Sequence, residues 1–128
     1  MKAEAVVYVK DVARMCAFYE RCAGMTVVET AEHYAVLESD AWTLSLVAVP
    51  DAIAATIELA VPPRRREAAA IKLAFAVASI DAARPIVAGL GGEVDRAETT
   101  WDFRGLRRVN ASDPEGNVFG LLESSAPA

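Results

Sequence analysis

The sequence predicts an α+β protein made of two tandem βαβββ modules, and three observations support this prediction. First, the chain carries one apolar pattern twice at an offset of 68 residues, so that Val9 corresponds to Val77 and Val12 to Ile80. Second, in each copy a short apolar strand leads into an amphipathic helix that ends at glycine. Third, three short strand-like segments bounded by turn residues follow each helix.

The first module is expected to span residues 3–50. Its opening strand runs from Glu4 to Lys10, Asp11 is suited to cap the following helix, and Gly24 is suited to end it. The helix carries an apolar stripe made of Val12, Met15, Phe18, Tyr19 and Cys22. Three strands follow, joined by polar hairpins at 31–33 and 39–41: Met25–Thr30, Tyr34–Glu38 and Trp42–Val49.

Residues 51–70 form a linker between the two copies, bounded by Pro50 and marked by the pair Pro62-Pro63. Residues 52–61 could form a short helical turn or an extra strand, and the sequence leaves both open. We interpret the basic run Arg64-Arg65-Arg66 as a solvated linker.

The second module is expected to span residues 71–124. It opens with the strand Ile71–Val77, followed by a helix that is capped at Ser79 or Asp81 and runs to Leu90. Pro85 lies inside this helix and removes one backbone hydrogen bond. Three further strands are expected, at Glu93–Arg96, Arg104–Ala111 and Asn117–Glu123. Residues 113–117 have the composition of a turn, with Pro at its second position and Gly at its fourth.

Length and composition limit the classes of protein to which the chain can belong. At 128 residues it is long enough for a single domain, residues 1–128, whereas either half alone would be marginal. We find no apolar run of membrane-spanning length and no signal peptide at the first residues, so we expect a cytoplasmic protein. The formal net charge of -5 disfavours a nucleic-acid partner, and no membrane partner is expected.

Cysteine and histidine offer little chemistry in this sequence. Cys16 and Cys22 lie on one predicted helix, about 9 Å apart along its axis and roughly 120° apart around it. A disulfide would break the helix, so both are expected to be buried apolar side chains. The one histidine, His33, is expected at an exposed hairpin tip.

Three segments resemble the vicinal oxygen chelate superfamily, which includes glyoxalase I, extradiol dioxygenases and the bleomycin-resistance proteins. They are Val9-Lys10-Asp11, the run from Phe18 to Met25, and Asp113-Pro114-Glu115-Gly116-Asn117. The resemblance extends from about residue 3 to residue 124 and is closest to the metal-free, bleomycin-resistance-like branch. It implies that the two modules form a curved mixed sheet shaped as a cup. It also implies a homodimer, with modules paired within a chain or across the dimer.

Alternation along the strands separates two faces of each sheet. Glu4, Val6 and Tyr8 share one face of the opening strand, whereas Phe119 and Leu121 share the large aliphatic face of the last strand. The aliphatic face suits packing under the helices. The smaller, mixed face suits the wall of a ligand cavity.

The resemblance implies four metal-ligand positions on the cavity face, occupied by His, Glu or Gln in the metal enzymes of the superfamily. Here they fall on Glu4, Ser45, Lys72 and Gly120. Only Glu4 is an ordinary ligand, because serine is a poor donor, lysine is a cation at neutral pH and glycine has no side chain. We therefore expect no metal and no other cofactor. A salt bridge between Glu4 and Lys72 is a further hypothesis for these positions.

The expected ligand-binding residues are side chains of the mixed faces and of the segment before the penultimate strand: Glu4, Val6, Tyr8, Ser45, Lys72, Trp101, Phe103, Arg104 and Gly120. Trp101, Phe103 and Tyr34 are candidates for stacking on a planar ligand, although core packing explains Trp101 and Phe103 equally well. Arg104, Arg107 and Arg108 could contact an anionic group or lie in solvent. Because the acidic net charge favours cations, an aromatic or cationic small molecule is expected.

Two functions from different classes follow. The favoured one is a metal-free small-molecule-binding protein that sequesters a drug or metabolite in the cup. The alternative is a divergent, glyoxalase-like lyase or isomerase that uses Glu4 as a general base or a displaced metal site. No catalytic residue is assigned.

Overall fold

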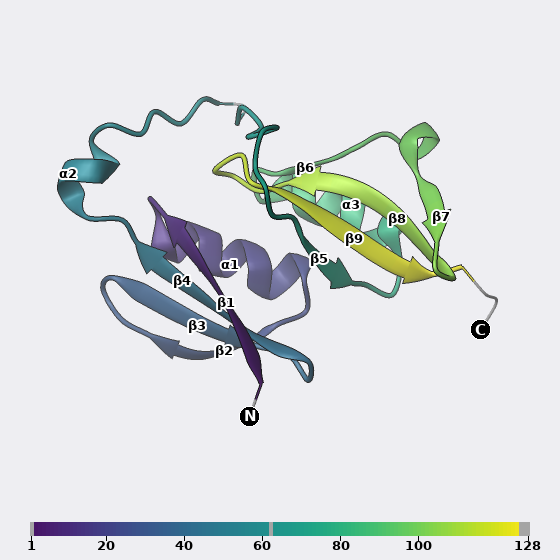
Figure 1. Ribbon diagram of the computed structural model, residues 1–128, viewed down its shortest axis with the longest axis horizontal. Coiled ribbons are helices and arrows are strands. Elements are labelled where there is room, and N and C mark those ends of the chain that lie inside the picture. The colour runs from purple at the N-terminus through teal and green to yellow at the C-terminus, as the bar shows by residue number, and fades with distance from the viewer. Residues whose placement is uncertain (1, 62, 126–128) are drawn as a thin grey trace. The chain divides into compact units, whose positions relative to one another are not determined.

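The computed structural model describes residues 2–61 and 63–125. The chain divides into two compact units, Met1–Ala60 and Val61–Ala128. Each unit contains one mixed β-sheet and one helix that packs on it (Figure 1). The predicted α+β class with two βαβββ modules is therefore confirmed.

The first unit follows the expected order of elements closely. Its sheet has the strand order β1-β4-β3-β2, with β1 parallel to β4 and the other neighbours antiparallel. The elements are β1 (Ala3–Val9), α1 (Val12–Cys22), β2 (Thr26–Thr30), β3 (Tyr34–Glu38) and β4 (Trp42–Ala48). Each bound lies within one residue of the predicted one.

Helix α1 covers one face of this sheet because its apolar stripe is continuous with the apolar side of the strands. The Asp11 carboxylate accepts a hydrogen bond from the Arg14 backbone N–H at 3.0 Å, as expected for the cap. Side chains of the helix and the strands bury each other fully in this layer, among them Met15, Phe18, Leu37, Leu44 and Leu46. Burial of each such side chain contributes about 1.5–3 kcal/mol to the free energy of folding. It also determines which face of the sheet lies under the helix and which does not.

The second unit repeats this topology with one strand added. Its sheet has the order β5-β9-β8-β6, and β7 pairs with the outer half of β8. The elements are β5 (Leu73–Ala76), α3 (Ile80–Gly89), β6 (Glu93–Val94), a 3-10 turn (Ala97–Thr99), β7 (Trp101–Phe103), β8 (Leu106–Ser112) and β9 (Val118–Ser124). Ser79 caps α3, because its Oγ accepts from the Ala82 N–H at 3.0 Å.

The predicted strand from Arg104 to Ala111 was wrong at its start. Arg104 and Gly105 both have positive φ, of 56° and 73°, and they form the tight turn between β7 and β8. Two-residue hairpin turns with positive φ at both positions match the twist of the flanking strands. Trp101 and Phe103 consequently belong to a strand of their own.

The linker between the copies also differs from expectation in one respect. Of the two alternatives left open for residues 52–61, the structure shows a short helix, α2 (Asp51–Ala54). The basic run is not simply solvated, because Arg65 forms an ion pair with Asp95 and donates to Ser112 Oγ at 3.2 Å and to the Glu93 carbonyl at 3.3 Å. Arg65 therefore packs on the second sheet, whereas Arg64 and Arg66 are exposed, as expected.

The turn before β9 is confirmed and sets the register of the β8–β9 hairpin. The Asp113 carboxylate accepts from the backbone N–H groups of Glu115 and Asn117 at 2.9 and 3.0 Å, and from Asn117 Nδ2 at 2.9 Å. Ser112 therefore lies opposite Val118, and Asn110 lies opposite Gly120.

The expectations for cysteine and histidine hold. Cys16 and Cys22 are both free and buried, and burial raises the pKa of the Cys22 thiol to about 11. The side chain of His33 is 74% exposed at the β2–β3 hairpin. In the part of the chain that the structure describes, we find no helix that is both long and apolar enough to cross a membrane.

Candidate functional site

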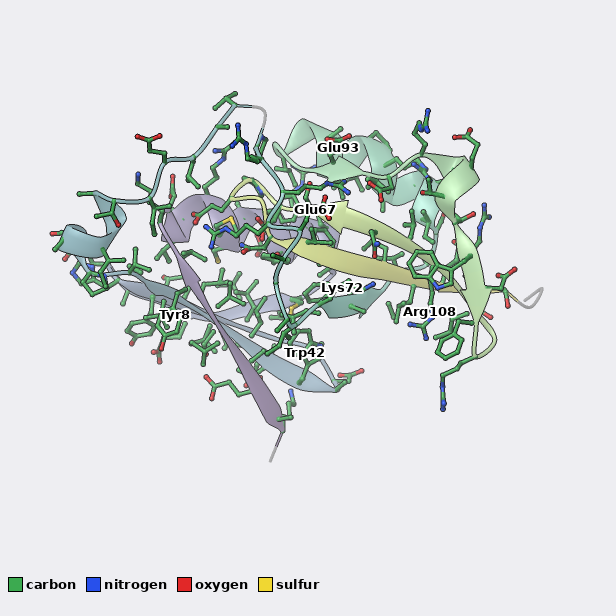
Figure 2. All side chains as sticks on the ribbon, turned by 45° about the horizontal axis from the view of Figure 1, so that its top comes forward. Tyr8, Trp42, Glu67, Lys72, Glu93 and Arg108 are labelled. Carbon is green, nitrogen blue, oxygen red and sulfur yellow. The ribbon has the colours of Figure 1, made fainter. Side chains whose placement is uncertain are left out.

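Each sheet has one face under its helix and one face without a helix, which we call the open face. On the open face of the first sheet, Glu4, Val6 and Tyr8 project from β1, next to Ser45 on β4. Val6 is 48% exposed and Tyr8, labelled in Figure 2, is 65% exposed. These large apolar side chains therefore leave considerable surface available for contact.

Glu4 and Ser45 are joined on this open face. Ser45 Oγ donates a hydrogen bond to Glu4 Oε1 at 2.6 Å, and only 8% of Ser45 is exposed. The parallel register, with Val6 opposite Ser45, brings the two side chains into diagonal contact. One carboxylate oxygen of Glu4 is thus already engaged by a neutral donor.

On the open face of the second sheet, two of the predicted residues come together with one that was not predicted. Lys72 Nζ donates to Asn110 Oδ1 at 2.9 Å and lies 5.3 Å from the centre of the Trp101 ring. This is the geometry of a cation–π contact. Gly120 lies opposite both Ala74 and Asn110 in the sheet; it has no side chain of its own and is buried.

Arg108 makes a second contact of the same kind. It lies opposite Trp101 in the sheet, and its Cζ is 5.2 Å from the centre of the Phe103 ring. Its Nε donates to the Phe103 carbonyl at 3.3 Å. Trp101 and Phe103 are 39% and 57% exposed, so of the two interpretations of these rings, core packing was wrong.

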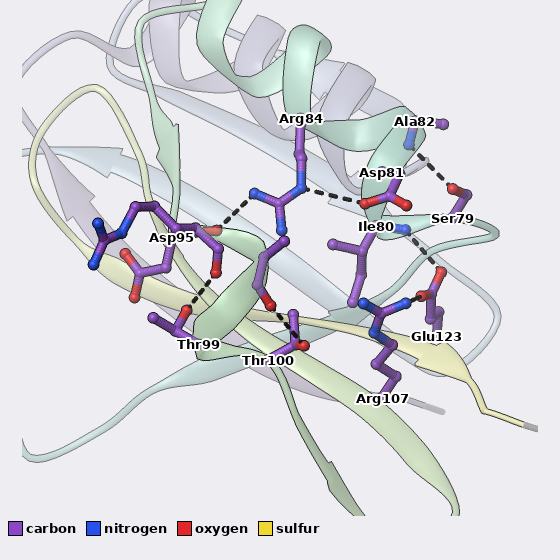
Figure 3. A network of polar contacts seen from close by, with 12 residues as sticks. Ser79, Ile80, Asp81, Ala82, Arg84, Asp95, Thr99, Thr100, Arg107 and Glu123 are labelled. Atoms are coloured by element: carbon purple, nitrogen blue, oxygen red, sulfur yellow. Dashed lines mark hydrogen bonds and ion pairs between the residues drawn. The ribbon is translucent and has the colours of Figure 1, made fainter.

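The three arginines considered for anion binding take three different positions. Arg108 lies on the open face beside Trp101, whereas Arg104 is exposed in the β7–β8 turn. Arg107 projects to the other side of β8, where Nη1 lies 3.5 Å from Glu123 Oε1 (Figure 3). Only Arg108 therefore accompanies Lys72.

The residues at the four metal-ligand positions do not suit a metal. In the first unit, Glu4 is a carboxylate and Ser45 is a poor metal ligand. In the second unit, Lys72 is a cation and Gly120 has no side chain. A divalent ion in such a site needs three or more anionic or imidazole ligands. Across residues 2–61 and 63–125, no group of three His, Cys, Asp or Glu side chains is placed to hold a metal ion.

The proposed pairing of Glu4 with Lys72 joins the two units, and it stays a prediction. Within its own unit, each of the two side chains has a neutral hydrogen-bond partner, Ser45 and Asn110 respectively.

Two hollows are present among the described residues, one away from the open faces and one beside Trp101. An apolar one of about 570 Å³ lies between α1 and the β2–β3 hairpin and is lined in part by Val12, Cys16 and Tyr34. Burial raises the pKa of the Cys16 thiol, and a hydrogen bond to the Glu29 carboxylate raises that of Tyr34. A polar one of about 460 Å³ is lined in part by Trp101, Asp102, Arg107 and Glu123.

Asn110 is the residue that sequence reasoning missed. Its partner Gly120 was among the predicted site residues, and the turn at 113–117 that brings them opposite each other was recognised. Counting outward from that turn would have identified Asn110 on the open face, because residues at equal distance from a hairpin turn pair across it.

Comparison with known proteins agrees with this architecture. A family model described as a glyoxalase-like domain matches residues 4–122. A search of curated proteins found no match.

Solved structures with the same fold span nearly the whole chain. A glyoxalase/bleomycin resistance protein/dioxygenase family enzyme from Burkholderia phytofirmans PsJN is 21% identical, with a TM-score of 0.68 over 95% of this chain and 97% of that one. The fosfomycin resistance protein FosX from Listeria monocytogenes is 14% identical, with a TM-score of 0.67 over 98% and 93%. A lactoylglutathione lyase from Agrobacterium tumefaciens is 18% identical, with a TM-score of 0.60 over 96% and 92%.

Proposed function

Since this chain belongs to the glyoxalase-like domain family, in the vicinal oxygen chelate superfamily, we propose that it has kept the fold and lost the metal site. In this proposal it is a small-molecule-binding protein that sequesters a drug or metabolite without a metal ion. The open faces of the two sheets supply the binding surface.

The observation that carries the proposal is the pairing of Lys72 with Asn110 and Trp101. An ammonium group at a ligand position repels a divalent cation, and at an effective dielectric constant of 20 two unit charges 4 Å apart interact by about 4 kcal/mol. Gly120 adds no donor at the neighbouring position. The second unit therefore offers repulsion where a metal enzyme needs ligands.

Loss of a metal does not by itself mean loss of a ligand. The side chains on the open faces combine exposed apolar surface, as at Val6 and Tyr8, with polar groups at fixed positions. Binding sites for small molecules have this composition. The exposure of Trp101 also supports binding, since a ring of this size is more often buried when it has no partner.

Metal analysis tests the proposal most directly. Protein purified without chelator should contain far less than one Ni, Zn, Fe or Mn ion per chain by plasma mass spectrometry. Any binding of these ions that calorimetric titration detects in the wild type should be absent from the variant His33→Ala, which removes the one histidine. Stoichiometric metal that survives in His33→Ala would overturn the proposal and favour a lyase or isomerase with displaced ligands.

A further inference from the structure

We propose that the open face of the second sheet binds a small organic anion with a flat aromatic ring, whose acidic group contacts Lys72 and Arg108 and whose ring stacks on Trp101. The inference rests on the proposed function and specifies the class of ligand. It also reverses the expectation of a cationic ligand that the net charge alone suggests.

The first step of the argument is the local charge. Within residues 63–125 no carboxylate lies within ion-pair distance of Lys72 or Arg108, although other basic residues of this unit, Arg65, Arg84 and Arg107, each have one. The partners of Lys72 and Arg108 are an amide oxygen, a carbonyl and two aromatic rings. Two positive charges therefore remain without a counter-charge in this unit of a chain with a formal net charge of -5.

The second step is that the two cations adjoin one ring. Lys72 Nζ lies over Trp101, while Arg108 lies opposite Trp101 on the adjacent strand, where directly paired side chains have Cβ atoms about 5 Å apart. Both residues appear on the second unit in Figure 2. A carboxylate or phosphonate that reached either cation would place an attached ring within stacking range of the indole.

The third step is that the cations are held in place in the absence of a ligand. Asn110 fixes the ammonium of Lys72, and Phe103 holds Arg108 through both its ring and its carbonyl. An ammonium carries three N–H donors and a guanidinium five, so each contact leaves donors for an anion. Because the side chains are already ordered, less conformational entropy is lost on binding.

The fourth step is the surface that the indole exposes, since Trp101 is 39% exposed. Ala74 and Gly120 pair across β5 and β9, and Asn110 lies next to Gly120 on β8. A Cβ added to Gly120 would come 3.3 Å from the Ala74 Cβ, so there is little room for a larger side chain at this position. Gly120 itself is buried, so a ring stacks on the exposed surface of Trp101 and not on this strip of the sheet.

Three probes with one ring system and different charge test the inference: 2-naphthoate, 2-naphthamide and 2-naphthylmethylammonium. Binding is followed by ¹H–¹⁵N NMR, in which the indole N–H of Trp101 is told apart from that of Trp42 by the variant Trp101→Phe. We expect 2-naphthoate to bind about tenfold more tightly than the amide, because the carboxylate accepts charge-assisted hydrogen bonds from the two cations. It should shift the Trp101 resonance and weaken as salt rises.

Matched variants assign the effect to the two cations. Lys72→Met and Arg108→Met should each weaken 2-naphthoate about tenfold and leave 2-naphthamide unchanged. Arg14→Met, which removes the same charge from the exposed side of α1, should change neither. The amide spectrum of each variant shows whether the fold is intact.

The outcomes separate this inference from the proposed function. If the amide or the ammonium probe binds as tightly as 2-naphthoate, or if Lys72→Met leaves 2-naphthoate unaffected, the anion specificity is overturned while ligand binding stands. If none of the three probes shifts any resonance at saturating concentration, the inference is overturned, while the proposed function is decided separately by the metal analysis.

Discussion

The identity of Gly116 is tightly fixed by its surroundings. Its φ is +84°, and a Cβ built there would meet the carbonyl oxygen of Arg64, a backbone atom. The same segment is held by a hydrogen bond from the Arg66 N–H to the Gly116 carbonyl at 2.9 Å. The turn and the linker thus approach each other closely only because this position lacks a side chain.

Gly105 provides a matched control for Gly116. Its φ is +73°, but a Cβ there would meet nothing within 4 Å. Gly105→Ala should lower the free energy of unfolding by about 1 kcal/mol, the cost of a left-handed conformation. Gly116→Ala should lower it by about 3 kcal/mol, because overpacking against backbone is added. Urea denaturation measures both, and equal losses would show that the linker does not pack on the turn.

At the scale of elements, helix α3 is fixed to its sheet through its first turn. Ser79 caps it locally, and Glu123 Oε2 from β9 accepts from the Ile80 backbone N–H at 2.8 Å. Glu123 Oε1 also faces Arg107 (Figure 3). A carboxylate at a helix N-terminus is favourable because the first N–H groups have no partner within the helix.

Replacing Glu123 should therefore destabilise the second unit. Glu123→Ala leaves the Ile80 N–H and the Arg107 guanidinium without this acceptor, and we expect the free energy of unfolding to fall by about 2 kcal/mol. Glu98→Ala is the control, since Glu98 and Arg96 form an ion pair of 3.8 Å whose side chains are both largely exposed. The control should change stability by less than about 0.5 kcal/mol. A comparable loss in the two variants would contradict the anchoring role of Glu123.

The βαβββ order could be predicted from local patterns, whereas the additional strand β7 could not. Trp101–Phe103 is three residues long, too short for alternation to identify it. The left-handed turn at Arg104 and Gly105 was missed because arginine gives no signal for positive φ. That omission left two interpretations of Trp101 and Phe103 open, since only the pairing of β7 with β8 decides which way the rings project.

At the scale of the whole molecule, a buried ionisable group couples stability to pH. Desolvation raises the pKa of Cys22 from 9.0 to about 11, and the charge of Arg21 lowers it only in part. The unfolded thiol loses its proton at lower pH than the folded one. This contribution to stability is therefore complete below pH 9 and is lost as the pH rises towards 11.

Denaturation at several pH values tests this coupling. Between pH 8 and pH 11 the wild type should lose about 2 kcal/mol more of its free energy of unfolding than Cys22→Ala, which has no thiol at this position. Comparing slopes with pH removes the constant cost of the smaller side chain. Parallel slopes for the two proteins would mean that the Cys22 thiol titrates normally in the folded state.

Part of the candidate site could be predicted from the alternation of residues along a strand, and part depends on how the strands pair. Strand alternation was enough to place Glu4, Val6 and Tyr8 on one face. It could not show that Ser45 donates to Glu4 or that Lys72 extends to Asn110, because those contacts join residues about 40 positions apart. The predicted homodimer stays a prediction.

The sequence by itself determined the doubled module, the helix caps, the buried faces and the residue types at the four ligand positions. Each of these follows from a period or from the chemistry of a single side chain, which is local information. Only the tertiary structure decided that Lys72 and Arg108 adjoin Trp101 without a carboxylate partner in their unit. The physical reason is that the sign of the charge at a surface depends on which distant strands pair, whereas composition gives only the sum over the chain.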